Sequence, residues 1–186
     1  MSLGIDPVVQ IAARVLLTLL FLGTAVHKMR DLRTTAAITS RYLQSFGLPG
    51  WPVLAAVVTA ALVAGELAAA GLCAVYPSGA AAAGLVAGLL GLYALGMAVS
   101  VLRGIAPEDC GCSWAGAAGQ PAGWALVLRT LVLVAVALLL APEATARPLA
   151  FAAYAGAFSL GLFAIAMYAT ADVLIANHGL LREQTS

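Results

Sequence analysis

Apolar residues lie in five long blocks along the chain, separated by short polar or turn-forming stretches. A helix needs about 20 apolar residues to cross a hydrocarbon core about 30 Å thick. The pattern therefore predicts an all-α membrane protein in which a single integral membrane domain, residues 1–186, forms a polytopic helical bundle. Four transmembrane helices pack together, and a fifth follows at the C-terminus. The predicted spans cover residues 8–26, 51–75, 80–102, 122–141 and 149–176.

The polar stretch after the first block has its own periodicity. Residues 31–46 predict a short amphipathic helix along the membrane interface, with Ile38, Tyr42 and Phe46 on one face at four-residue spacing. Such a helix either rests on the membrane surface or forms a lid over a site at the same face. The sequence leaves both alternatives open.

Composition agrees with a membrane protein and excludes one class of partner. Hydrophobic residues make up 63% of the 186-residue chain and charged residues 9%, whereas soluble domains carry about 25% charged residues. The formal net charge is +1, without a basic run. We therefore expect a lipid bilayer as the surrounding phase and no nucleic-acid partner.

Small residues dominate the third block, from Gly79 to Gly96. In lipid, glycine and alanine let helices approach closely, because helix association there has no hydrophobic driving force. We expect these glycines to form a helix-packing surface.

Four ionisable residues fall inside the predicted spans, where charges are costly and usually face the bundle interior. Arg14 and Glu66 lie nearest to the same membrane face, so they predict a structural ion pair. Arg129 and Asp172 lie near the opposite face. Arg129 either pairs with Asp172 or provides positive charge near a cysteine pair.

That pair, Cys110 and Cys112, lies in the stretch PEDCGCSWAG between two apolar blocks. A structural disulfide within Cys-x-Cys is strained, and strain favours exchange. A tetrahedral metal site needs more ligands than two thiolates, and the chain has only two histidines, so no metal is expected. Inert burial suits Cys73, inside the second block, better than a loop pair. The remaining interpretation is a redox-active dithiol.

The dithiol needs help from cations, because the two acidic residues directly before Cys110 disfavour a thiolate. Arg103 and Arg129 flank the loop in sequence, and Lys28 belongs to a loop predicted at the same membrane face. A reactive cysteine therefore requires Arg103, Arg129 or Lys28 to approach it.

At this point four stretches resemble the MauE family of methylamine-utilisation membrane proteins, which is grouped with a broader DoxX-like set. They are FLGTAVHKMRDL, LVAGELAAAGL with Glu66, RGIAPEDCGCSW, and LVLRTLVLV with Arg129. The resemblance implies a multi-pass protein of the bacterial inner membrane. It also implies a role in maturing a disulfide-rich periplasmic client, the methylamine dehydrogenase small subunit, with a thioredoxin-like partner and with Cys110 and Cys112 as the family's cysteine pair. Ser113 and Trp114 depart from the Phe-Gly expected after that pair.

Charge and family role disagree about the side of the membrane. The face predicted to carry the cysteine loop has six basic residues and the other face has only Arg147. The positive-inside rule therefore places the loop in the cytoplasm, whereas a disulfide-rich periplasmic client requires it on the other side.

Two functional hypotheses follow. In the first, the protein is a membrane thiol–disulfide oxidoreductase that exchanges electrons with the thioredoxin-like partner, in a direction that the sequence does not fix. A quinone near Trp114, Trp124 and Arg129 is suggested only by analogy with DsbB-like and vitamin K epoxide reductase-like proteins, and no other cofactor is expected. In the second, the protein is a non-enzymatic membrane assembly or transport subunit with a structural cysteine pair.

Overall fold

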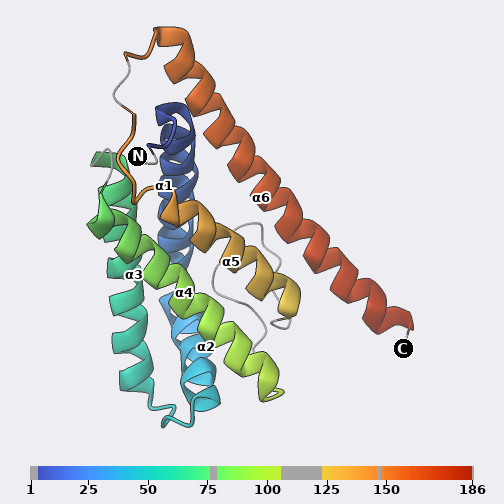
Figure 1. Ribbon diagram of the computed structural model, residues 1–186. Helices are drawn as coiled ribbons and strands as arrows, with labels where there is room; N and C mark the ends of the chain where they lie inside the picture. Colours follow the sequence, from blue (N-terminus) through green and yellow to red (C-terminus); the bar gives the residue numbers. More distant parts are fainter. Residues whose placement is uncertain (1–3, 76–78, 106–122, 146–147, 186) are drawn as a thin grey trace.

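The computed structural model describes residues 4–75, 79–105, 123–145 and 148–185. Within these ranges the chain is helical, with one isolated β-bridge between Ile5 and Ala144 and no strand. The helices are α1 (Pro7–Arg30), α2 (Leu32–Ser45), α3 (Pro52–Val75), α4 (Ala80–Leu102), α5 (Trp124–Leu138) and α6 (Phe151–Thr185). Figure 1 shows α3 and α6 beside α1, and α4 beside α5. The predicted all-α class is confirmed.

Four of the helices, α1, α3, α4 and α6, are long and apolar enough to cross a membrane. They coincide with four of the predicted spans. The remaining predicted span, residues 122–141, forms α5, which has 15 residues and is shorter than the roughly 20 needed to cross. That α5 crosses the bilayer remains a prediction.

The two ends of the bundle differ in what they contain. One end, called here the α2 end, carries α2, the C-termini of α1 and α4, and the N-termini of α3 and α5. At the opposite end, the Gly79 amide donates to the Leu140 carbonyl at 3.3 Å, and the Thr145 amide donates to the Ile5 carbonyl at 3.1 Å. Gln10 Nε2 donates to the carbonyl of Leu139 at 3.2 Å. It thus provides a hydrogen-bond partner for a carbonyl at the C-terminal end of α5, where the helix itself provides none.

Helix α2 is a separate element with well-defined ends. The Asp31 carboxylate accepts a hydrogen bond from the Thr34 amide at 3.1 Å, as an N-cap does. Gly47, with φ of 78°, follows the last turn in the left-handed conformation that commonly ends helices. The predicted helix over residues 31–46 is thus confirmed, while its position along the membrane interface remains a prediction.

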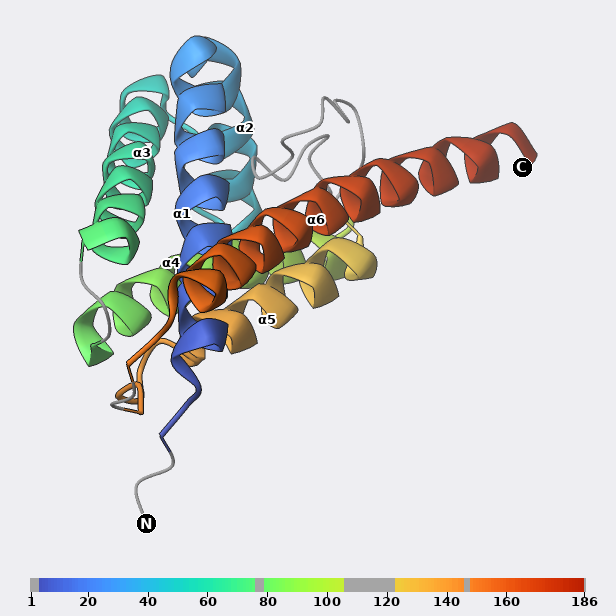
Figure 2. The same ribbon diagram turned by 90° about the horizontal axis from the view of Figure 1, so that it is seen from above.

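Two hydroxyl pairs fasten α2 to its neighbours. Thr59 of α3 donates to Thr39 at 2.9 Å, and Ser100 of α4 donates to Ser45 at 3.0 Å. All four side chains are buried. Because buried hydroxyls need hydrogen-bond partners, these two pairs fix the position of α2 against α3 and α4. Figure 2 shows from above how α2 lies relative to α1 and α3.

The glycines of α4 do not form the predicted packing surface. A β-carbon added at Gly84, Gly88 or Gly91 would meet no atom within 4 Å, and at Gly96 it would meet only Tyr42. α4 instead buries alanines and larger residues against its neighbours. Close approach occurs at Gly161 of α6, where an added β-carbon would lie 2.6 Å from the Val15 side chain of α1.

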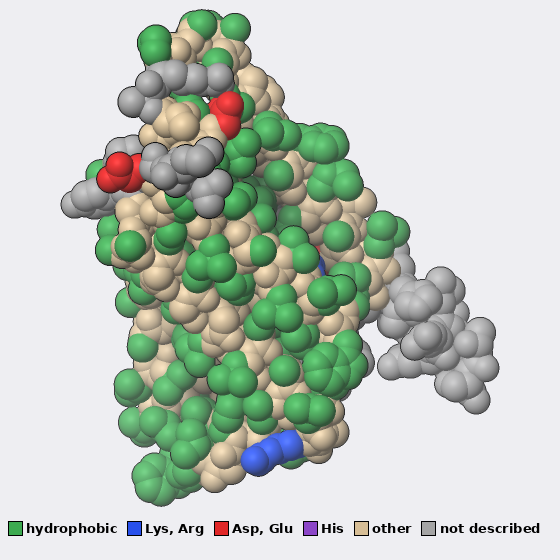
Figure 3. All heavy atoms as spheres, viewed as in Figure 1, with side chains coloured by type: hydrophobic (Ala, Val, Ile, Leu, Met, Phe, Trp, Pro, Cys, Tyr) green, Lys and Arg blue, Asp and Glu red, His purple; other side chains and the backbone are tan. Residues whose placement is uncertain are grey.

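The outer surface of the bundle is apolar. On the face in Figure 3, hydrophobic side chains predominate, with acidic side chains near one end and a basic side chain at the other. Large apolar residues such as Val53 and Phe151 are 76% and 87% exposed. Exposed apolar surface on this scale is unusual for a soluble monomer and fits a chain surrounded by lipid.

Candidate functional site

A buried ionic cluster joins three helices in the interior of the bundle. Lys28 of α1 forms an ion pair with Glu66 of α3. Its ammonium also donates to the Tyr93 hydroxyl of α4 at 2.8 Å, and that hydroxyl donates to Glu66 Oε1 at 2.7 Å. Lys28 is 3% exposed and Glu66 is fully buried. The ion pair leaves the cluster with no net charge, and Glu66 Oε2 has no hydrogen-bond partner among the described residues.

Helical periodicity explains why a lysine at the end of α1 faces inward. Leu17, Phe21, Thr24 and Lys28 are spaced by four, three and four residues, and all are buried. Side chains at this spacing share one face of a helix. Because α1 continues to Arg30, this face carries Lys28 into the bundle and not into a loop.

The predicted ion pair between Arg14 and Glu66 is replaced by two separate interactions. Glu66 pairs with Lys28, while Arg14 donates through Nε to the Cys73 carbonyl at 2.8 Å and through Nη2 to the Ala74 carbonyl at 3.0 Å. These carbonyls belong to the last turn of α3, where a cation is favourable. The position of Arg14 along its span correctly predicted a contact with α3. Position along a span does not, however, fix how a helix is rotated about its axis.

Arg129 and Asp172 form the second buried ion pair, which links α5 to α6. The guanidinium of Arg129 also lies over the Tyr168 ring, 4.7 Å from its centre. The structure therefore realises the pairing alternative for Arg129. The second alternative, a position of Arg129 near the cysteines, stays a prediction, because Cys110 and Cys112 lie outside the described residues.

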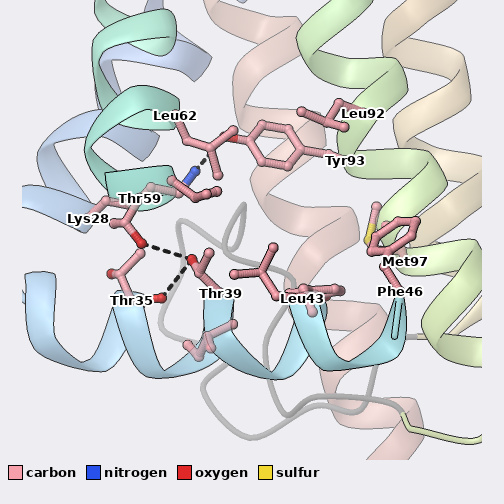
Figure 4. Close-up of a pocket in the computed structure, with 14 residues that line it drawn as sticks. Lys28, Thr35, Thr39, Leu43, Phe46, Thr59, Leu62, Leu92, Tyr93 and Met97 are labelled. Carbon is pink, nitrogen blue, oxygen red and sulfur yellow. Dashed lines mark hydrogen bonds between the residues drawn. The ribbon is translucent and has the colours of Figure 1, made fainter. Parts of the chain in front are cut away.

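A cavity of about 160 Å³ lies between α2, α3 and α4. Figure 4 shows Lys28 and Tyr93 at one side of it, with residues of α2 along the other. Ile38, Tyr42 and Phe46, predicted to share one face of α2, all line this cavity. The apolar face of α2 thus covers a cavity next to the ionic cluster, as the lid alternative requires.

The remaining predicted site residues divide into two groups. Cys110, Cys112 and Trp114 lie outside the described residues. Arg103 is exposed just after α4, and Trp124, 57% exposed, begins α5. Both of these lie at the α2 end, so the described residues that flank the cysteine segment on either side belong to that end of the bundle.

Sequence reasoning missed three members of this site, Tyr93, Thr39 and Thr59. A signal existed for Tyr93, because a tyrosine inside an apolar span needs a partner for its hydroxyl. The two threonines gave none, since threonine can satisfy its hydroxyl on its own helix. Among the described residues no cluster of His, Cys, Asp and Glu could hold a metal ion.

These features define a multi-pass helical membrane protein with a neutral, buried polar cluster under an amphipathic helix. The family model described as "Methylamine utilisation protein MauE" matches residues 6–143, and the chain belongs to this family. A relative from Paracoccus denitrificans, named "Methylamine utilization protein MauE", is 35% identical over 185 residues, which cover 98% of this chain and 94% of the relative. No solved structure matches the chain.

Proposed function

We propose that the protein is a thiol–disulfide redox protein of the bacterial inner membrane. Cys110 and Cys112 form its working dithiol and support disulfide formation in a client such as the methylamine dehydrogenase small subunit. The observation that carries the proposal is the sequence itself: two of three cysteines stand one residue apart, between two apolar helices of a MauE family member. The name of the Paracoccus relative supports methylamine utilisation as the setting.

The exchange chemistry needs only the two cysteines and a thioredoxin-like partner. In one direction, a thiolate of the pair attacks the partner's disulfide and forms a mixed disulfide, releasing one partner thiolate. The second cysteine then attacks the mixed disulfide, so the pair becomes oxidised and the partner becomes a dithiol. The reverse sequence oxidises the partner. Two electrons and two protons move in either direction.

Arg103 is the best supported cation for stabilising the thiolate. Of the cations predicted to do so, Lys28 is paired with Glu66 and Arg129 with Asp172, and both are buried. Arg103 is exposed at the end of α4, and no ion pair involving it occurs among the described residues. A positive charge near a cysteine lowers its pKa and raises its thiolate fraction.

We propose that the cysteine pair faces the periplasm, because disulfides persist there. Exposed arginines at the α2 end, among them Arg33 and Arg41, favour the cytoplasm by the positive-inside rule. A membrane-impermeant maleimide applied to intact cells distinguishes the two. Labelling of Cys110 or Cys112 in intact cells supports the periplasmic side, and labelling only after permeabilisation contradicts it.

An exchange assay tests the function. The purified protein is mixed with a thioredoxin-like protein in defined redox states, and transfer is followed by thiol alkylation. Cys110→Ser and Cys112→Ser should each abolish complete exchange, and one of them should accumulate the mixed disulfide. Cys73→Ser, at a buried cysteine in α3, is the matched control and should exchange normally. Unchanged exchange in both loop variants would exclude the proposal.

A further inference from the structure

The cavity beneath α2 has the size of a single six-membered ring. Its volume is about 160 Å³, and an apolar protein cavity of about 150 Å³ is known to bind benzene. Its walls are mainly apolar and include two aromatic residues, Tyr42 of α2 and Phe46 directly after that helix. Aromatic walls favour a flat ring over a flexible chain.

One side of this cavity offers a hydrogen-bond donor to a ligand. An ammonium has three N–H donors, and Lys28 uses two of them on Glu66 and the Tyr93 hydroxyl. Tyr93 gives its own proton to Glu66. Lys28, which lines the cavity, thus has one N–H left among the interactions of the described residues.

The charge of the cluster selects a neutral ligand. Glu66 already balances Lys28, so an anionic head group would bring an uncompensated charge into the bundle, which is costly. The Lys28 ammonium is a donor, so a ligand that bonds to it must present an acceptor. A neutral ring that carries a carbonyl oxygen meets both requirements.

The cavity is reached from the apolar surface of the protein. Phe46 and Leu92 line it and are 40% and 51% exposed, whereas Lys28 lies buried. A ligand therefore enters from the surroundings of the helices and reaches the ammonium last. A molecule dissolved in the bilayer fits this route.

We propose that this cavity binds a membrane-soluble quinone, with the ring against Tyr42 and Phe46 and one carbonyl oxygen accepting a hydrogen bond from Lys28. Acyl esters of bilayer lipids share the carbonyl but lack the ring. Binding is independent of the proposed function. The redox role of the quinone, in contrast, rests on the proposed function. When Cys110 and Cys112 form a disulfide, they lose two electrons and two protons, and the quinone takes these up and becomes a quinol.

The test measures binding of a radiolabelled benzoquinone with a ten-carbon tail to the full-length protein in detergent micelles, by scintillation proximity. Unlabelled decylbenzene has the ring without the carbonyl, and methyl oleate has the ester without the ring. We expect decylbenzene to compete at least about tenfold more weakly than unlabelled quinone, because it lacks the acceptor for the charged Lys28 donor. Methyl oleate should also compete at least about tenfold more weakly, because it lacks the ring that would pack against Tyr42 and Phe46. Equal competition by methyl oleate would assign the cavity to lipid esters and overturn the proposal, as would equal competition by decylbenzene.

Variants locate the site. Gly96→Leu fills the cavity next to Tyr42, while Gly91→Leu makes the same change on α4 where an added β-carbon meets nothing within 4 Å. The first should weaken quinone binding at least about tenfold and the second should leave it unchanged. The neutral double variant Lys28→Met/Glu66→Gln should also weaken it about tenfold. Binding unaffected by both the cavity-filling and the neutral variants would overturn the proposal.

A cysteine variant separates this inference from the proposed function. Quinone binding should persist in Cys110→Ser/Cys112→Ser, because the residues proposed to hold the ring and the carbonyl oxygen, Tyr42, Phe46 and Lys28, are unchanged in this variant. Loss of thiol exchange with intact quinone binding would thus concern the cysteines alone. Loss of binding in that double variant would show that the cavity is not the binding site.

Discussion

Lys28 carries a charge that is buried inside the helical bundle, and two partners offset the free-energy cost of burying it. Removing an ammonium from water is costly, and the cost is offset only if opposite charge and hydrogen bonds replace the water. Glu66 and Tyr93 provide them. Glu66 Oε2 is itself buried without a hydrogen-bond partner in the described part of the chain, so the cluster depends on the single oxygen that faces Lys28 and Tyr93.

Replacing Glu66 by glutamine is expected to destabilise the protein. Glu66→Gln leaves the Lys28 charge buried without its counter-ion, a change that costs about 3–5 kcal/mol for buried pairs. Chemical unfolding in mixed micelles measures it. Glu143→Gln, the same substitution at an exposed residue, is the control and should have no effect. Lys28→Met/Glu66→Gln should recover part of the loss, and a Glu66→Gln protein as stable as the control would contradict the buried pair.

The N-cap of α2 should make that helix sensitive to acid. The Thr34 side chain and then its backbone amide hold the pKa of the Asp31 carboxyl below its usual value of 3.8. A depressed pKa contributes stability above the unfolded value, and this contribution is lost as the pH falls through the folded pKa. Amide exchange of α2, corrected for the intrinsic rate, should therefore speed up below about pH 3.8 in the native protein.

Asp31→Asn keeps an acceptor at the same position without a titratable group. The acid-induced increase in α2 exchange should be absent from this variant. An increase of the same size in both proteins would show that another group controls the response.

At the scale of the helices, apolar block length and periodicity predicted most of the fold but not how the helices face each other. The face with Ile38, Tyr42 and Phe46 was predictable, because apolar residues that recur every four positions are typical of one face of an amphipathic helix. The rotation of α1 and α3 was not. A span that is apolar all round has no marked face, so Arg14 and Glu66 were paired by depth alone.

The contact between α1 and α6 should not tolerate a larger residue at Gly161. An added β-carbon there would lie 2.6 Å from Val15 and 2.9 Å from the Ala12 carbonyl oxygen, so the backbones must move apart. We expect Gly161→Ala to cost about 1–3 kcal/mol, the usual cost of overpacking. Thermal unfolding of the protein in detergent provides the measurement.

Gly156→Ala is the matched control on the same helix, where an added β-carbon meets nothing within 4 Å. It should be neutral or slightly stabilising, because alanine has the higher helix propensity. If both variants behave alike, α6 does not pack on α1 at Gly161.

For the whole molecule, the α2 end combines the features that a redox role would use. The cavity and exposed Arg103 lie there, and so do the described residues that flank the segment with Cys110 and Cys112. The family was predictable from short stretches that contain polar residues, because these are specific to it, whereas apolar spans match many proteins by chance. The cluster was not, because it depends on three helices that come together only in the folded bundle.

The reduction potential of the Cys110–Cys112 pair tests the central claim most directly. In a Cys73→Ala protein only these two cysteines remain, so maleimide alkylation across a series of redox buffers reports their oxidation alone. A working dithiol should have a midpoint between about −270 and −120 mV, the range of catalytic pairs. A midpoint below about −300 mV is typical of structural disulfides and would contradict the redox function in favour of a structural pair.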